Sequence, residues 1–444
     1  MLASGLKSAR VQRIMALDPN VFLKELFDAA IARADPRLVM ADALPPAPTQ
    51  GRVIVLGAGK AAAAMAAALE AAWPRPMEGL VVTRYGHACP VERIEVIEAG
   101  HPMPDAAGAA AARRMLELAA SAGPADTVVF LASGGASALL AAPADGIDLG
   151  DKQALTGALL RSGATIHQMN AVRKHLSLIK GGKLAAAASP ASVLTLAISD
   201  VPGDAPDVIG SGPTVPDIST LADARQVLAE FGIEPPPSIA RRLADPSAET
   251  PKLGDPIFAR ATFKMIAAPY ASLEAAKARS EAAGVPAVIL SDRIEGESRE
   301  VAKVLAALAR NVAERRAPFT PPVVLLSGGE TTVTVRGAGR GGRNAEFLLA
   351  LGLALDGLPG VHAMAGDTDG IDGVEDNAGA SIGPAFLRRC RAAGIDPVAR
   401  LADNDAFTVF SALDDLIVTG PTLTNVNDFR AILIGPDPDD GGVR

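Results

Sequence analysis

The run from Val323 to Gly373 constrains this chain more than any other stretch, because it joins strand-like and helix-like segments through loops rich in glycine, arginine and aspartate. It opens with an apolar segment, 323–326, that breaks at Ser327–Glu330. Residues 331–335 then alternate with the period of a half-buried strand. A loop, a helix, a further strand and an aspartate-rich turn follow. This order of segments predicts an α/β domain.

The loops of this run contain residue types that bind anions and cations. Glycines in 336–343 let the backbone approach a ligand closely, and the arginines there supply planar forks for phosphate or carboxylate. Asn344 is expected to cap the following helix, whose positive end adds to the anion site. Asp367, Asp369 and Asp372 are suitable ligands for a hard divalent cation. The pattern favours a metal-nucleotide and an acidic substrate, and the alternative is an exposed turn with solvated charges.

Composition excludes several classes of protein. With 444 residues of which 49% are hydrophobic, the chain can bury the cores of two or three domains. A net charge of −8 argues against non-specific binding to nucleic acid or anionic membranes, and 3% aromatic residues argue against base-stacking surfaces. Cys89 and Cys390 alone cannot form a disulfide framework. Residues 1–13 lack the apolar core of a signal peptide, and no uninterrupted apolar segment is long enough to span a membrane, so a cytoplasmic protein is expected.

Strands alternate with helices in both halves of the chain, which predicts two α/β domains with largely parallel sheets. Prolines gather between 235 and 256 and are typical of a domain boundary. We therefore expect an N-terminal domain over 1–245 and a C-terminal domain over 257–444. The second domain should open with the strand at 262–267.

The strand at 52–56 leads into Gly57-x-Gly59-x-x-Ala62, a relaxed dinucleotide fingerprint that is weak by itself. The next strand ends in Thr83-Arg84 without an acid for a ribose, although Arg84 suits a 2′-phosphate. Lys60 begins the helix, where its ammonium could neutralise a transferring phosphoryl group. The alternative for Lys60 is a solvated lysine. No Walker pattern is present, so a kinase here would be of another type.

Two further strand ends carry candidate site residues. The loop 133–137, Ser-Gly-Gly-Ala-Ser, could cradle phosphates or simply form a tight turn, and Ser327–Gly329 echoes it at the end of a later strand. Asp200 and Asp204 flank a turn after the strand 193–198, where each could bind a metal, act as a base or cap an Asx turn.

The helical segment 165–187 carries several polar residues. Asn170, Arg173 and Lys180 recur at helical spacing and could line one face, whereas ordinary surface charge is the default for Lys174 and Lys183. The five histidines show no paired metal-ligand spacing, and the Gly-x-Ser-x-Gly motif of serine hydrolases is absent.

Taken together, these motifs resemble the glycerate 2-kinases that are unrelated to Walker-motif kinases, some of whose members have been labelled hydroxypyruvate reductases. The matching segments run in order along nearly the whole chain: 57–61, 133–139, 170–177, 180–185, 199–204, 210–214, 341–346, 367–373 and 419–428. One departure is Ala345, where the family usually has glutamine.

The resemblance implies an α/β protein with a Rossmann-like N-terminal domain, a smaller C-terminal α/β domain and an active site in the cleft between them. It implies transfer of phosphate from ATP, with Mg²⁺, to the 2-hydroxyl of D-glycerate. Lys60 and Arg343 match the family's proposed catalytic pair. One cation from each half would meet the other when the cleft closes and excludes water.

The resemblance also implies binding residues. Contacts to the nucleotide and phosphates fall on Gly57, Gly59, Ser133, Gly134, Gly135, Ser137, Arg173, Lys180, Ser211, Glu330, Asn344, Thr424 and Asn425. The candidate metal ligands are Asp200, Asp369 and Asp372. An NADPH-dependent hydroxypyruvate reductase and a non-enzymatic sensor of organic acids are the alternatives, and a homodimer is left open.

Overall fold

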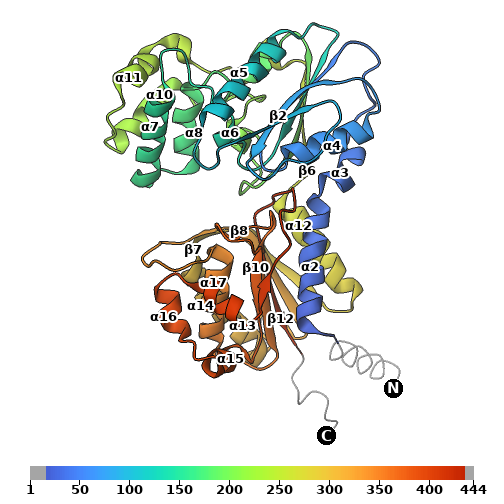
Figure 1. Cartoon of the computed structure of the whole chain (residues 1–444), viewed down its shortest axis with the longest axis vertical. Helices are drawn as coiled ribbons and strands as arrows, with labels where there is room; N and C mark the ends of the chain where they lie inside the picture. The colour runs from blue at the N-terminus through green and yellow to red at the C-terminus, as the bar shows by residue number, and fades with distance from the viewer. Residues whose placement is uncertain (1–16, 436–444) are drawn as a thin grey trace. The chain divides into compact units, whose positions relative to one another are not determined.

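The computed structural model describes residues 17–435, which form two compact units. Unit 1 comprises residues 17–34, 269–422 and 426–435, and unit 2 comprises residues 35–268 and 423–425. The segment 1–13 considered for a signal peptide lies outside the described residues. The two units are coloured along the chain in Figure 1, and each is described by itself.

Unit 2 is built on a six-stranded parallel sheet with the order β3-β2-β1-β4-β5-β6. The strands are β1 (Val53–Ala58), β2 (Glu78–Arg84), β3 (Glu95–Ala99), β4 (Thr127–Ala132), β5 (Ser192–Ile198) and β6 (Ala261–Ala267). All residues of the central strand β1 are buried, as expected for a parallel strand covered on both faces. The strand order reverses direction between β1 and β4, and open α/β sheets bind ligands at the carboxyl ends of such a pair.

Helices and short 3₁₀ turns connect these strands. They are α3 (Pro36–Ala43), α4 (Ala62–Ala72), α5 (Ala106–Ala120), α6 (Ala136–Leu139), α7 (Leu149–Ser162), α8 (Ile166–His175), α9 (Lys183–Ala188), η1 (Ile209–Ser211), α10 (Leu221–Glu230), α11 (Pro237–Ala244), η2 (Pro246–Ala248) and η3 (Pro256–Phe258). Several of these helices begin at a residue whose side chain accepts a hydrogen bond from a backbone amide, as Asp105 does from Gly108 at the start of α5. Alternate residues of β1, Ile54 and Leu56, pack with α5 in the core of this unit.

The predicted domain boundary differs from the division seen in the structure. The strand expected to open the second domain, β6, pairs in parallel with β5 and completes the first sheet. Lys264 on β6 donates to the carbonyl of Ala43 in the same unit. The proline-rich segment 235–256 is therefore an excursion within unit 2, and the chain enters unit 1 only at Pro269.

Unit 1 contains a second six-stranded sheet, with the order β11-β10-β9-β12-β8-β7. Its strands are β7 (Ala287–Glu297), β8 (Val323–Thr332), β9 (Val361–Asp367), β10 (Gly379–Ile382), β11 (Leu416–Ile417) and β12 (Asp428–Ile434). β7 and β8 pair in parallel, but each of the other neighbouring pairs is antiparallel. The prediction of a largely parallel sheet is therefore wrong for this half of the chain.

Helices cover both faces of the second sheet. They are α2 (Pro19–Ala34), α12 (Pro269–Ala282), α13 (Ser298–Arg315), α14 (Arg343–Leu355), α15 (Phe386–Ala392), α16 (Pro397–Ala402) and α17 (Ala406–Ala412). On one face, Phe27 of α2 packs against Phe429 of β12 with ring centroids 5.5 Å apart. On the other face, Ile432 of β12 joins the core under α13 and α14. Figure 1 shows α2 and α12 side by side, away from α14.

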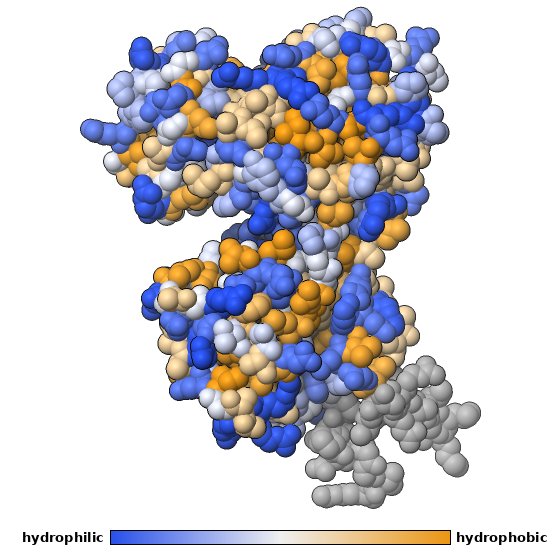
Figure 2. Space-filling view, viewed as in Figure 1, coloured by the Kyte–Doolittle hydropathy of each residue, from blue (hydrophilic) through white to orange (hydrophobic). Residues whose placement is uncertain are grey.

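No helix within residues 17–435 is long and apolar enough to cross a membrane. Hydrophilic and hydrophobic residues are interspersed over the face of each unit seen in Figure 2. Two of the most exposed large apolar side chains, Leu253 and Val374, belong to different units.

Candidate active site

The loops that follow β1 and β4 are joined to each other at the carboxyl edge of the unit 2 sheet. The amide of Lys60 donates to the carbonyl of Gly134 over 2.8 Å, and the amide of Ala61 donates to the Ser133 hydroxyl over 3.0 Å. The carbonyl of Lys60 accepts a 3.3 Å hydrogen bond from the hydroxyl of Thr83. The backbone of Lys60 is therefore fixed at the start of α4 by groups from two neighbouring strands.

The approach of the two loops requires glycine at position 59. Gly59 has φ +135°, a conformation that other residues rarely adopt, and an added Cβ would lie 2.1 Å from the Ser133 hydroxyl oxygen. Gly57 lies within β1, where a Cβ would meet the carbonyl oxygen of Leu131 at 2.8 Å. The close contacts at Gly57 and Gly59 are therefore with neighbouring protein strands. The buried Ser133 hydroxyl likewise joins the loops together.

We expect Gly59→Ala to destabilise the protein by about 1–3 kcal/mol or more, because the new methyl group meets backbone and the φ angle becomes strained. Thermal unfolding of the variant and its parent measures the difference. Gly86→Ala is the matched control, since Gly86 has φ +79° but no atom within 4 Å of an added Cβ. An effect at Gly59 no larger than at Gly86 would contradict the packing argument.

Three predicted site residues converge beside this loop pair. The Nδ2 atom of Asn425 donates to Oδ2 of Asp200 over 3.1 Å, and both side chains face Gly134. A Cβ at Gly134 would lie 2.1 Å from the Asp200 oxygen, and one at Gly135 would lie 2.9 Å from the ring of His101. The neighbouring Thr424 is buried. The edge of the sheet thus brings a carboxylate, an amide and an imidazole close to the backbone that holds Lys60.

A second cluster is formed by residues of α6, α8 and η1 together with Lys180. The hydroxyls of Ser137 and Ser211 are 2.8 Å apart, and Ser211 donates to Oδ1 of Asn170 over 3.2 Å. The ammonium of Lys180 donates to the carbonyl of Ser137 over 2.6 Å and lies 3.3 Å from its hydroxyl. Arg173, on the same helix as Asn170, is half-buried. These predicted residues form one polar group inside unit 2.

Burial lowers the pKa of each cation in this cluster, and neighbouring positive charges lower the pKa of the two lysines further. Burial, together with the charges of Lys152 and Arg173, holds the pKa of Lys180 well below its ordinary value. Burial and the charge of Arg173 lower the pKa of Lys152 to about 8. Lys152 is a residue that the sequence motifs did not indicate.

In unit 1, Arg343 forms the first turn of α14 and is held by carboxylates from three strands. Its guanidinium donates to Asp428 over 2.7 Å, to Asp367 over 2.7 Å and to Glu330 over 3.4 Å. Although burial disfavours the charge, these carboxylates hold the pKa of Arg343 well above its ordinary value. The structure thus brings Arg343 and Glu330 together in a network that also includes Asp428.

Asp428 is the centre of this network. Besides Arg343, its buried carboxylate accepts hydrogen bonds from Asn344 over 2.8 Å and from Arg430 over 2.5 Å. The Arg430 side chain is fully buried and its guanidinium lies over the ring of Phe347. Arg343 and Arg430 together hold the pKa of Asp428 below its ordinary value despite its burial.

The start of α14 corrects one prediction, and the metal role predicted for Asp372 stays a prediction. Asn344 does not cap the helix; Gly342 occupies the N-cap position, and Asn344 lies inside α14 with its amide on Asp428. Asp372, predicted as a metal ligand, accepts the backbone amides of Asn344 and Ala345 over 2.9 and 2.8 Å. The carboxylate of Asp372 thus satisfies the open amides of the helix start, with one oxygen on each.

Burial raises the pKa of Asp372 to about 6 against its ordinary value of 3.8, so we expect a carboxyl resonance that titrates near pH 6. Because the folded protein then binds the proton more tightly than the unfolded chain, Asp372 favours folding below pH 3.8 and this contribution is lost as the pH rises through 6. Carbon-13 NMR of the carboxyl groups, assigned with Asp372→Asn, measures the pKa. A midpoint near 4 would contradict the prediction.

The other aspartates of the turn after β9 are also engaged locally. Oδ1 of Asp367 accepts the amide of Asp369 over 3.0 Å, and Oδ1 of Asp369 accepts the amide of Ile371 over 2.9 Å. Across residues 17–435, no group of three or more His, Cys, Asp or Glu side chains is arranged to hold a metal ion. Mg²⁺ usually binds through one or two carboxylates together with substrate phosphates.

The predicted loop at Ser327–Gly329 does not exist. β8 runs from Val323 to Thr332 without a break, and β12 pairs with Gly328 and Gly329 in register. Residues 327–329 are buried inside a sheet, so they resemble the loop at Ser133 in sequence but not in structure.

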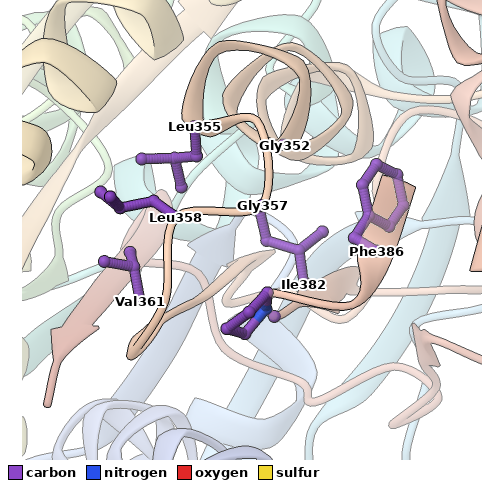
Figure 3. Close-up of a pocket in the computed structure, with 9 residues that line it drawn as sticks. Gly352, Leu355, Gly357, Leu358, Val361, Ile382 and Phe386 are labelled. Carbon is purple, nitrogen blue, oxygen red and sulfur yellow. The ribbon is translucent and has the colours of Figure 1, made fainter. Parts of the chain in front are cut away.

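An apolar hollow lies beyond the C-terminal end of α14. Figure 3 shows Leu355, Leu358, Val361, Ile382 and Phe386 around it, together with glycines and a proline. None of its lining residues carries an ionisable side chain. The hollow therefore lacks the groups that phosphate or acid chemistry needs.

Two protein families match the chain. Residues 22–244 match the family described as a domain of unknown function, DUF4147, and residues 323–428 match the MOFRL family. The first match covers much of unit 2, and the second covers the part of unit 1 that carries Arg343 and Asp428.

Relatives of the whole chain carry two different names. A protein of Agrobacterium vitis provisionally named hydroxypyruvate reductase is 54% identical over 416 residues, 93% of this chain and 94% of the relative. The D-glycerate 2-kinase of Thermotoga maritima is 41% identical over 385 residues, 86% of this chain and 91% of the relative. The crystal structure of glycerate kinase from Thermotoga maritima matches with a TM-score of 0.85 at 39% identity, over 94% of this chain and 99% of that chain. The chain therefore belongs to the glycerate 2-kinase family, which carries DUF4147 and MOFRL domains and includes members named hydroxypyruvate reductase.

Proposed function

We propose that the protein is a glycerate 2-kinase, which transfers the terminal phosphoryl group of ATP to the 2-hydroxyl of D-glycerate and forms 2-phospho-D-glycerate and ADP. The observation that carries this proposal is the match over most of the chain to a D-glycerate 2-kinase. Charged groups at the starts of α4 and α14 support it, because phosphoryl transfer depends mainly on positioning and on neutralising developing charge.

In this proposal unit 2 is Rossmann-like and binds its ligand at the carboxyl ends of β1 and β4, where the strand order reverses. Lys60 stabilises charge on the transferring phosphoryl group. Its fixed backbone supports this role, because a preorganised cation needs little rearrangement at the moment of reaction. Gly134 and Gly135 have no side chain, which lets a phosphate approach their backbone amides closely.

In unit 1, Arg343 supplies the second cation. Asp367 and Asp428 hold its guanidinium in one orientation, which supports binding of a carboxylate or phosphate through the remaining N–H groups. Magnesium would enter with ATP, held by its phosphates and by Asp200 or Asp369, and would supply Lewis-acid neutralisation of the phosphates when bound. The cleft expected between the two domains stays a prediction.

An NADPH-dependent hydroxypyruvate reductase is the second candidate. The name of the Agrobacterium vitis relative favours it, as do the glycines around β1 and Arg84 at the end of β2. Against the reductase, the two glycines of the dinucleotide fingerprint are already explained by packing within the protein, because Gly57 contacts the neighbouring strand and Gly59 contacts the Ser133 loop.

One set of assays separates these candidates. The pure protein is incubated with D-glycerate and MgATP, and in parallel with hydroxypyruvate and NADPH. ADP formation that requires D-glycerate, with 2-phosphoglycerate identified by phosphorus NMR, supports the kinase. Oxidation of NADPH without ADP formation supports the reductase. Binding of D-glycerate without turnover in either assay would refute both and support a sensor.

A further inference from the structure

Lys152 stands in an environment that is unfavourable for a cation. It lies in the first turn of α7, where the positive end of the helix dipole repels it. The residue is 7% exposed, and its Nζ atom is buried without a hydrogen-bond partner. An unpaired ammonium held out of water costs free energy unless an anion shares the site.

The neighbours of Lys152 increase this cost. α7 packs against α8, which carries Arg173 (Figure 1). α8 in turn packs against η1, which carries Ser211. Arg173 and Lys180 are close enough that the charges affect one another. Within residues 17–435, no carboxylate forms an ion pair with Lys152, Arg173 or Lys180.

A nearby lysine shows how this chain treats a buried cation that has a structural role. Lys174 is as buried as Lys180, but its ammonium is paired with Asp217 over 2.9 Å and with Asp207 over 3.1 Å. Two carboxylates therefore neutralise Lys174 within the protein. Among the described residues the Lys152 cluster has no such carboxylate, so a bound anion would supply the missing negative charge.

We propose that Lys152 joins Arg173 and Lys180, which the family resemblance already gives as phosphate contacts, in one pocket that binds an anionic group of a substrate, a carboxylate or a phosphate. Arg173 offers a planar fork of donors, and the two lysines offer compact charges, which is a donor set suited to several oxygens of one anion. The hydroxyls of Ser137 and Ser211 and the amide of Asn170 lie beside Lys180 and can bind further oxygens. The proposal rests on the proposed function in that D-glycerate and ATP supply both kinds of anion.

Lys152→Met tests the pocket, because it removes the charge and keeps most of the side-chain volume. Without added anions we expect a higher melting temperature than the parent, since a buried charge without a partner is lost. With D-glycerate or with inorganic phosphate, the ligand-induced rise in melting temperature should need roughly 10- to 100-fold more ligand. Lys152→Arg should retain most of this response.

Lys174→Met is the matched control, and Lys303→Met on the exposed surface of α13 is a second one in case the first does not fold. The first should lower the melting temperature without anions, because Asp217 loses its partner, and a folded variant should keep the response to anions. Lys303→Met should change neither property. A Lys152→Met protein that is less stable without anions and responds to phosphate like its parent would overturn the proposal.

Steady-state kinetics identify which anion occupies the pocket. A rise in the KM for D-glycerate at unchanged KM for ATP assigns it to the acceptor's carboxylate, and the reverse assigns it to a phosphate of ATP. The melting experiments with inorganic phosphate require no turnover. If D-glycerate-dependent ADP formation is absent from the parent, the proposed function fails, while the phosphate response still decides whether the pocket exists.

Discussion

Replacing Lys60 by methionine is expected to lower kcat/KM for D-glycerate phosphorylation at least about 100-fold, the usual loss when one preorganised donor to a transition state is removed. The backbone of Lys60 is held by Gly134 and Thr83 through its own amide and carbonyl. These bonds survive the substitution, so the loop should keep its shape. The change therefore acts on the charge at the start of α4, where a bound anion is favoured by the helix dipole.

The measurement is the initial rate of ADP formation over a range of D-glycerate and MgATP concentrations, with thermal unfolding to verify folding. A predominant fall in kcat is expected, since the interaction strengthens in the transition state. Lys303→Met, with 59% side-chain exposure on α13, is the control and should retain full activity. Turnover of Lys60→Met within about threefold of the parent would refute the catalytic role of Lys60, because one useful charge contributes far more than that.

Replacing Asp428 by asparagine is expected to destabilise unit 1 by about 3–5 kcal/mol, the usual cost of removing one partner from a buried ion pair. The Arg430 side chain is fully buried, and of its guanidinium nitrogens Nε and Nη1 have no hydrogen-bond partner. Its Nη2 atom depends on Asp428 and Thr331. Without the Asp428 charge, Arg430 loses the carboxylate to which its guanidinium donates, and Arg343 loses one of its anchors.

Urea unfolding measures the change in the free energy of unfolding. Amide hydrogen exchange of β8, β9 and β12 in the native protein shows whether the loss lies within unit 1. The matched control is Glu300→Gln, which breaks the exposed pair with Lys303 and should cost less than about 1 kcal/mol. Adding Arg430→Met to Asp428→Asn should restore part of the stability, because the unpaired cation is then removed. A loss at Asp428 no larger than at Glu300 would show that this network contributes little to stability.

The sequence predicts unit 2 well because its signals are local. Each strand of the parallel sheet is an apolar run followed by a turn and a helix, so the loops at Gly59, Ser133 and Asp200 fall together at one edge of the sheet. The Gly134 contacts with Asp200 and Asn425 join segments distant in the sequence, and the sequence motifs named all three residues.

Strand direction in unit 1 could not be read in the same way. β8, β9 and β12 are buried along most of their length because helices cover both faces of their sheet, and strands buried on both faces are usual in parallel sheets. Their antiparallel pairing depends on partners far along the chain. The same limit applies to β6, whose apolar pattern identifies a strand but not the sheet to which it belongs.

Residue roles were missed where burial decides them. Asp372 lies in a run of aspartates, and the contact of its carboxylate with the amides at the start of α14 depends on the fold. Lys152 belongs to an ordinary polar helix in sequence, and only its burial among other cations distinguishes it from a surface lysine. Asp428 follows an asparagine-rich loop, where no spacing rule indicates its arginine partners.

The packing of α2 has a consequence for the order in which the protein is made. Phe27 of α2 packs on Phe429 of β12, so an early-synthesised helix completes its contacts only when the last strand of the sheet has left the ribosome. All strands of unit 2 are synthesised in between, and domains generally fold as units during translation. Unit 2 is therefore expected to fold first on the ribosome. The apolar face of α2 then stays without its contact to β12 until the C-terminal strand has been synthesised, and during this time a chaperone can bind it.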